Sequence, residues 1–118
     1  MSGTITQNGG LNVGYLEAPQ RATGTTTLVL SDSGKHIYNT TASQTYTIPA
    51  NASVAYPIGT TLMFVNQGVG TCSIAITNDT MFLAGVGSTG TRALAAYGIA
   101  TAIKTTTTTW IIGGTGLS

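Results

Sequence analysis

The most constraining feature of this sequence is an alternation of apolar and polar residues with a period of two, which runs from Thr25 to Ile112. It is cleanest over 72–77, where Cys72, Ile74 and Ile76 alternate with small or hydroxyl residues. Successive side chains of a β-strand point to opposite faces, so this alternation predicts half-buried strands. Thr occurs 24 times and Gly 16 times, and both residue types disfavour helices. We therefore expect an all-β domain.

Expected strands are separated by turns that contain Gly, Asn or Asp. The strand segments are 25–30, 45–48, 62–65, 72–77, 99–104 and 110–112. Segment 62–65 is apolar on both faces, which favours a central strand, and the threonines 105–109 are expected to end one strand and start the next. The Ala-rich segment 92–97 is compatible with a helical turn, but the β-type residues after Gly98 favour a hairpin that turns near 96–98. Short strands at short spacing predict an antiparallel β-sandwich or jelly-roll-like barrel.

Residues 1–24 differ from the rest of the chain and are expected to form an extended N-terminal arm, with the β-sandwich domain over 25–118. The arm is Gly-rich and carries a small apolar group, Leu11, Val13, Tyr15 and Leu16. In an extended strand, Leu11, Val13 and Tyr15 would share one face. We expect this group to bind a neighbouring subunit, although it could instead pack on its own domain.

Charge is scarce in this chain of 118 residues, a length typical of one domain. Charged residues make up 6% of the sequence, against about 25% in an ordinary soluble protein. A formal net charge of +1 provides no field for nucleic acid and no polybasic patch for a membrane. Such a surface suits a chain buried in an assembly, and the alternative is a neutral monomer coated with threonine. The N-terminus has neither the basic nor the apolar region of a signal peptide, and the apolar-rich run 93–103 is too short to span a bilayer.

Few residues are available for catalysis. His36 is the single histidine, and a nucleophilic arrangement would have to join it to Cys72, Asp32 or Asp79 without a nucleophile-elbow motif. Paired carboxylates for glycoside cleavage would have to come from Glu17, Asp32 and Asp79. We therefore expect a structural histidine and no enzyme activity.

No metal or cofactor site is expected, because one His, one Cys and scattered acids provide no ligand cluster. Cys72 cannot form an intrachain disulfide and is expected to be a small buried apolar residue. Residues 85–90 match the dinucleotide pattern G-x-G-x-x-G, but no acidic residue follows Asp79, so a Gly-rich connection is expected. Three N-glycosylation patterns, at Asn39, Asn51 and Asn78, are interpreted as chance matches in a Thr-rich chain.

Aromatic residues allow two interpretations. They could form a platform for stacking sugars, or they could pack in the core and at subunit interfaces, which we favour. The residues concerned are Tyr15, Tyr38, Tyr46, Tyr56, Tyr97 and Trp110.

Several segments, taken in order, resemble a β-rich domain that recurs in virion proteins of tailed bacteriophages, both in tail fibres and in small capsid-associated proteins. The segments are 28–38 (LVLSDSGKHIY), 47–51 (TIPAN), 56–60 (YPIGT), 64–67 (FVNQ), 83–85 (LAG), 100–104 (ATAIK) and 110–117 (WIIGGTGL). The resemblance covers roughly residues 12–118. It implies a non-enzymatic structural module that is trimeric.

Two functions are compatible with this resemblance. A domain that stands nearly alone behind an arm resembles a capsid decoration, or cement, protein, which is made in the host cytoplasm and stabilises the exterior of the shell. Its partners would be the major capsid protein and its own copies in a homotrimer, and Leu11, Val13, Tyr15 and Leu16 would be the contact residues. The alternative is a receptor-binding tail-fibre or tail-tip module that recognises a glycan or protein of the host surface. A small hydrolase is a third interpretation, disfavoured for lack of residues.

Overall fold

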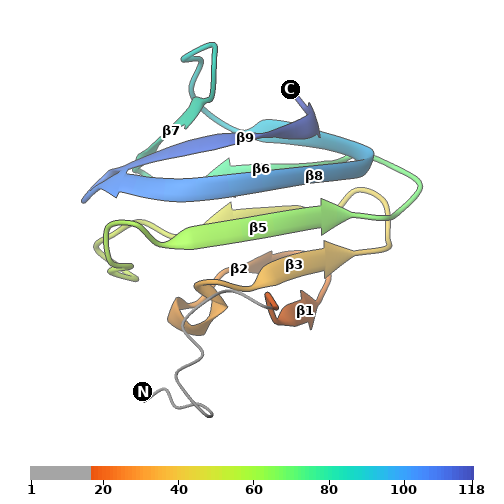
Figure 1. The fold of residues 1–118 in the computed structure, drawn as a ribbon, viewed down its shortest axis with the longest axis horizontal. Helices are drawn as coiled ribbons and strands as arrows, with labels where there is room; N and C mark the ends of the chain where they lie inside the picture. Colours follow the sequence, from red (N-terminus) through yellow and green to blue (C-terminus); the bar gives the residue numbers. More distant parts are fainter. Residues whose placement is uncertain (1–16) are drawn as a thin grey trace.

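A computed structural model describes residues 17–118, which form nine β-strands and one short 3-10 helix (Figure 1). The elements in chain order are β1 (Gln20–Ala22), β2 (Thr26–Thr27), η1 (Leu30–Asp32), β3 (His36–Asn39), β4 (Thr45–Ile48), β5 (Thr61–Asn66), β6 (Cys72–Ile76), β7 (Thr80–Leu83), β8 (Arg92–Thr106) and β9 (Thr109–Leu117). The all-β prediction is confirmed for this part of the chain. No helix in it has the length and apolar character needed to cross a bilayer.

The first six strands wind in three turns, and each turn places one strand in each of two layers. β1, β3 and β5 pair in parallel to form the first layer, and β2, β4 and β6 pair in parallel to form the second. Consecutive strands therefore lie in opposite layers rather than beside each other. Figure 1 shows β3 and β5 in front of the paler β6.

β8 joins the two layers into one curled sheet. Its first residues, Arg92–Leu94, pair with β6, and residues 98–103 pair with β5, both antiparallel. The strand shifts register between Leu94 and Ile99, and Tyr97 adopts a φ of 65°, which a non-glycine residue seldom does. The result is a half-barrel with the strand order β1-β3-β5-β8-β6-β4-β2. The predicted hairpin near 96–98 is wrong, because the chain bends there and continues as one strand.

The predicted antiparallel β-sandwich or jelly-roll-like barrel is also wrong. Five of the eight strand pairings in residues 17–118 are parallel, and both layers belong to one mixed sheet. The physical reason lies in the turns after β3 and β5, which carry the chain across to the other layer instead of folding it back along the same edge.

Two stacked asparagines shape these turns. Asn39 and Asn66 are buried partners in the parallel register of β3 and β5, and Asn39 Nδ2 donates to Asn66 Oδ1 at 2.9 Å. Asn39 Oδ1 accepts from Thr41 N, and Asn66 Oδ1 accepts from Gly68 N, both at 3.1 Å. A Cβ at Gly68 would lie 2.9 Å from the carbonyl carbon of Thr40, so glycine lets the two turns stack closely. The side chains thus satisfy buried backbone groups that a tight corner would otherwise leave unpaired.

β8 and β9 form a long antiparallel hairpin that closes one end of the winding. β8 ends at Thr106 and β9 begins at Thr109, so the predicted strand–turn–strand over 105–109 is confirmed. β7 pairs in parallel with the first part of β9, from Thr109 to Ile112.

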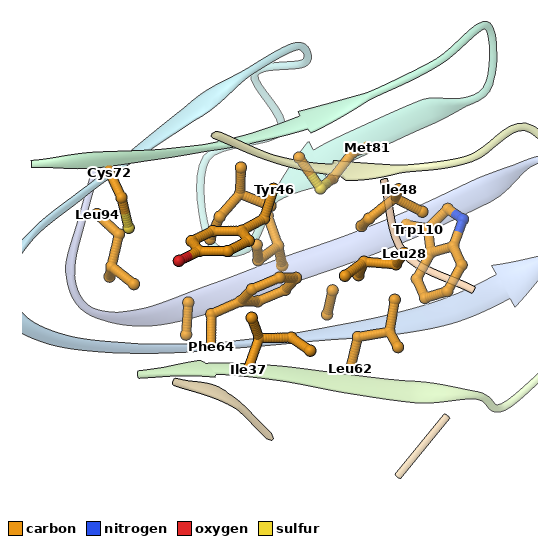
Figure 2. Close-up of a cluster of buried hydrophobic side chains, with 14 of the residues drawn as sticks. Leu28, Ile37, Tyr46, Ile48, Leu62, Phe64, Cys72, Met81, Leu94 and Trp110 are labelled. Carbon is orange, nitrogen blue, oxygen red and sulfur yellow. The ribbon is translucent and has the colours of Figure 1, made fainter. Parts of the chain in front are cut away.

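The core lies between the two layers. Ile37, Leu62 and Phe64 point inward from β3 and β5, and Tyr46 meets them from β4 (Figure 2). Ile74 of β6 belongs to the same buried cluster. The rings of Tyr46 and Phe64 lie 6.3 Å apart across the layers. The central position predicted for 62–65 and the half-buried strand predicted for 72–77 are confirmed, with β5 between β3 and β8.

The start of the described chain differs in part from expectation. β1 lies inside the range 1–24 assigned to an arm and pairs with β3. The predicted strand 25–30 is shorter, because β2 ends at Thr27 and Leu30 begins η1. The Asp32 carboxylate accepts from Val29 N at 2.9 Å and turns the chain there. Leu11, Val13, Tyr15 and Leu16 lie outside the described residues.

Candidate interaction surface

The first layer, extended by β8, β9 and β7, carries three rows of outward side chains. Each row crosses the sheet in register, alternating along every strand with the buried core residues. The rows are Tyr38–Val65–Ile99–Thr115, His36–Met63–Thr101–Gly113 and Thr61–Ile103–Ile111–Phe82. We call this surface the apolar face.

Four large apolar side chains of this face are exposed. Ile99 is 50% exposed, Ile103 42%, Ile111 39% and Phe82 38%. Ile103 is paired directly with Ile111, and Ile111 with Phe82, so three of them form a continuous apolar line over β8, β9 and β7. Contiguous exposed apolar surface of this kind marks interaction sites in soluble proteins.

The outward face of the second layer has a different composition, and we call it the hydroxyl face. Thr27, Thr47 and Ala75 form one row across β2, β4 and β6, and Thr45 is paired with Ser73 in another. These five residues carry no large apolar side chain. The two outer faces of the molecule are therefore chemically distinct.

The charges nearest the core support the fold. Lys104 is 2% exposed, and its Nζ donates to Asn51 Oδ1 at 2.7 Å and to the Tyr56 carbonyl oxygen at 2.8 Å. Both acceptors belong to the connection between β4 and β5, so Lys104 ties this long loop to β8. Asp79 accepts from Asn51 N at 2.8 Å.

A second polar contact lies beside β1. Arg21 forms an ion pair with the fully buried Asp32, which also holds the backbone of Val29. The Tyr56 hydroxyl donates to the Val29 carbonyl oxygen at 2.6 Å. Arg21 and Asp32 are therefore committed to structure.

The candidate catalytic residues do not meet in one site. The His36 ring lies at the start of β3, with Nδ1 3.0 Å from the Ala18 carbonyl oxygen and Nε2 3.1 Å from Gln20 Nε2. Because a carbonyl oxygen can only accept, Nδ1 donates to Ala18, and both ring nitrogens of His36 are used in contacts within the protein. Cys72 is buried and unbonded to any other cysteine, and burial raises the pKa of its thiol, which disfavours the thiolate nucleophile.

Neither the carboxylates nor the glycine motif form a ligand site in residues 17–118. These residues contain no group of three or more His, Cys, Asp or Glu side chains that could hold a metal ion. The segment 85–90 connects β7 to β8, as predicted, and lacks the following helix that a dinucleotide site needs. A surface hollow of about 330 Å³ is lined by Ala18, Ser33, Gly34, Gly59, Thr60, Thr61 and Met63, with no ionisable group among them.

Most aromatic residues pack inside the protein, as favoured above. Tyr46, Tyr56 and Trp110 are buried, and the rings of Tyr56 and Trp110 meet edge to face at 5.7 Å. Tyr97 is 72% exposed at the bend of β8. Tyr46, Tyr56 and Trp110 therefore cannot stack a sugar; Tyr38 is half-buried on the outward side of β3, and Tyr15 lies outside the described residues.

The sequence did not reveal the apolar face. The alternation over 99–104 was visible, but it did not show that Ala100, Ala102 and Lys104 face inward while Ile99 and Ile103 face out. No family model matches this chain, and no curated protein matches it. The resemblance to phage virion proteins thus stays a prediction, and the functional argument depends on the geometry of the surface.

Proposed function

We propose that this chain is a non-enzymatic structural protein of a tailed-phage virion, which decorates the exterior of the capsid and stabilises the shell as a homotrimer. The N-terminal arm contacts the major capsid protein through Leu11, Val13, Tyr15 and Leu16. The protein is made in the host cytoplasm and joins the particle there.

The observation that carries this proposal is the uncharged apolar face. Its exposed isoleucines suit a chain whose outer surface is covered in an assembly rather than left in water. The distribution of ionisable groups agrees with a structural role, because Arg21, Asp32 and Lys104 are all used to hold loops and strands.

The receptor-binding alternative is less well supported. A glycan-binding module is expected to expose several aromatic rings together, and Tyr46, Tyr56 and Trp110 are buried. The enzyme alternative has no assembled catalytic residues in the described part of the chain.

Purified virions provide the test. An epitope-tagged copy detected by gold labelling in electron micrographs should lie on the capsid, and virions assembled without the protein should release their genome at a lower temperature. A label on the tail would support the receptor-binding alternative instead. Purified wild-type virions that contain none of the protein would overturn the proposal.

A further inference from the structure

We propose that the apolar face is the contact through which copies of this chain associate. The inference rests on the oligomer of the proposed function and names the surface that forms it. The occupant of the face is a second copy of the chain, and the arm remains available for the shell.

The absence of formal charge from the face is the first argument. The three rows contain no Asp, Glu, Lys or Arg, although they include twelve positions on five strands. Burying an unpaired charge is costly, whereas an uncharged surface can be buried against an identical one without that cost. A face of this composition is therefore compatible with its own copy.

The contrast between the two outer faces is the second argument. Both faces belong to the same sheet, but among the rows described above the large apolar residues all lie on the apolar face. The Thr and Ser hydroxyls of the hydroxyl face bond readily to water. The protein therefore has one outer face suited to solvent and one suited to protein.

Size is the third argument. Strands lie about 4.8 Å apart and alternate residues about 6.8 Å apart, so the twelve positions cover roughly 390 Å². A standard interface buries about 800 Å² on each partner, so the face supplies about half of one side. Tyr97, 72% exposed, lies two residues before Ile99 on β8.

Packing of identical copies also removes the hazard that such a face creates. An exposed apolar sheet surface on a free monomer favours uncontrolled aggregation. A closed set of copies buries the face and leaves the hydroxyl face outside. Association through this face thus explains how a chain with 6% charged residues avoids exposing its isoleucines.

The test compares Ile103→Glu on the apolar face with Thr47→Glu on the hydroxyl face. Both variants add one carboxylate to the outer side of a strand. Light scattering with size-exclusion chromatography should show an oligomer for the wild type and for T47E, and I103E should associate at least about tenfold more weakly. An I103E protein that keeps the wild-type association, or a wild type that stays monomeric at high concentration, would overturn the inference.

A second measurement covers the case in which I103E fails to fold, which circular dichroism would detect. Hydroxyl-radical footprinting of the wild type should show severalfold lower oxidation of Phe82 and Met63 at high than at low protein concentration. Leu30, 57% exposed on η1, serves as the control and should not change. Equal oxidation of Phe82 at both concentrations would contradict the inference.

Binding to particles, measured separately, distinguishes this inference from the proposed function. A wild type that associates through the face but binds no capsid would leave the inference standing and remove the function. An I103E protein that stays oligomeric yet loses capsid binding would identify the shell as the occupant and overturn the inference.

Discussion

Lys104 occupies an inward position of β8 that is flanked on the outward side by isoleucine. Its amine reaches past the core and donates hydrogen bonds to Asn51 and to the backbone carbonyl of Tyr56. At this position of the core, hydrogen bonds take the place of apolar packing. Ala100 and Ala102, the other inward residues nearby, are small and lie opposite Phe64 and Leu62. Large side chains from β5 fill the space that these alanines leave.

Replacing Lys104 by methionine should lower the free energy of unfolding by about 1–3 kcal/mol, because the carbonyl oxygens of Asn51 and Tyr56 lose their donor. Urea unfolding monitored by Trp110 fluorescence measures this change. Lys35→Met, at the lysine directly before β3, removes a lysine without these bonds; it is the matched control and should differ little from the wild type. A K104M protein as stable as the wild type would show that these bonds contribute nothing net.

Tyr46 should make the free energy of unfolding depend on pH in the alkaline range. Burial, with a smaller effect of Cys72, raises the pKa of the Tyr46 phenol from 10.0 to about 12. Below pH 10 both the folded and the unfolded state keep the proton. Between pH 10 and about 12 the unfolded state releases it first, so the free energy of unfolding should fall by about 2–3 kcal/mol over this range.

The variant Tyr46→Phe should reduce this alkaline fall, as measured by denaturant unfolding at pH values from 8 to 12. Burial also raises the pKa of Tyr56, so part of the fall should remain. Tyr97→Phe, which removes a hydroxyl from an exposed tyrosine, is the matched control. An unchanged profile in Y46F would place the alkaline sensitivity elsewhere.

At the scale of elements, the pairing of β9 with β8 brings the two backbones very close together at Gly114. A Cβ at Gly114 would lie 2.0 Å from the Ile99 carbonyl oxygen and 2.6 Å from Ala100 Cα, and neither atom belongs to a side chain that can turn away. The neighbouring Gly113 is different, because its Cβ would meet only Ala84 Cβ, at 3.0 Å.

Gly114→Ala should therefore lower the free energy of unfolding by about 3 kcal/mol or more. Gly113→Ala should lower it clearly less. Thermal unfolding of the two variants gives the comparison. An equal loss of stability in both variants would mean that the general cost of replacing a glycine in a strand, rather than the close approach of β9 to β8, determines the effect.

The strands themselves were largely predictable, since the alternation in 45–48, 62–65 and 72–77 reports directly on burial. The partner of each strand was not. Asn66 is an ordinary turn former in the sequence and Asn39 belongs to a chance glycosylation pattern, and their stacking appears only when both strands are in place. The bend of β8 was also not predicted. No local sequence preference indicates the φ of 65° at Tyr97, and β8 is held in place by its pairing with three other strands.

At the scale of the whole molecule, the buried core of residues 17–118 lies within residues 28–112, and Leu117 packs against it. Deleting residues 1–16 should therefore leave a folded oligomer, since no described core contact is removed, but this oligomer should no longer bind particles. Circular dichroism, light scattering and cosedimentation with capsids measure the three properties. Full particle binding by the truncated protein would remove the arm from the proposal, and failure to fold would place the arm in the core.

The candidate surface illustrates what a sequence pattern leaves open. The apolar group Leu11, Val13, Tyr15 and Leu16 stood out because it interrupts a Gly-rich segment. Ile99, Ile103 and Ile111 did not stand out, because isoleucine in a strand normally faces the core. Their exposure follows from the tertiary arrangement, in which Phe64 and Tyr46 already occupy the interior.

The winding of the first six strands allows the domain to be lengthened turn by turn along the direction in which its strands stack. Each turn adds one strand to each layer and advances the structure by about 4.8 Å, while the β8–β9 hairpin closes the stack at one end. A duplicated turn inserted before β5 would present its neighbours with the same parallel edges and the same asparagine corner. The fold can therefore change its length by gene duplication within a single domain, and keep both its closing hairpin and the chemistry of its two outer faces.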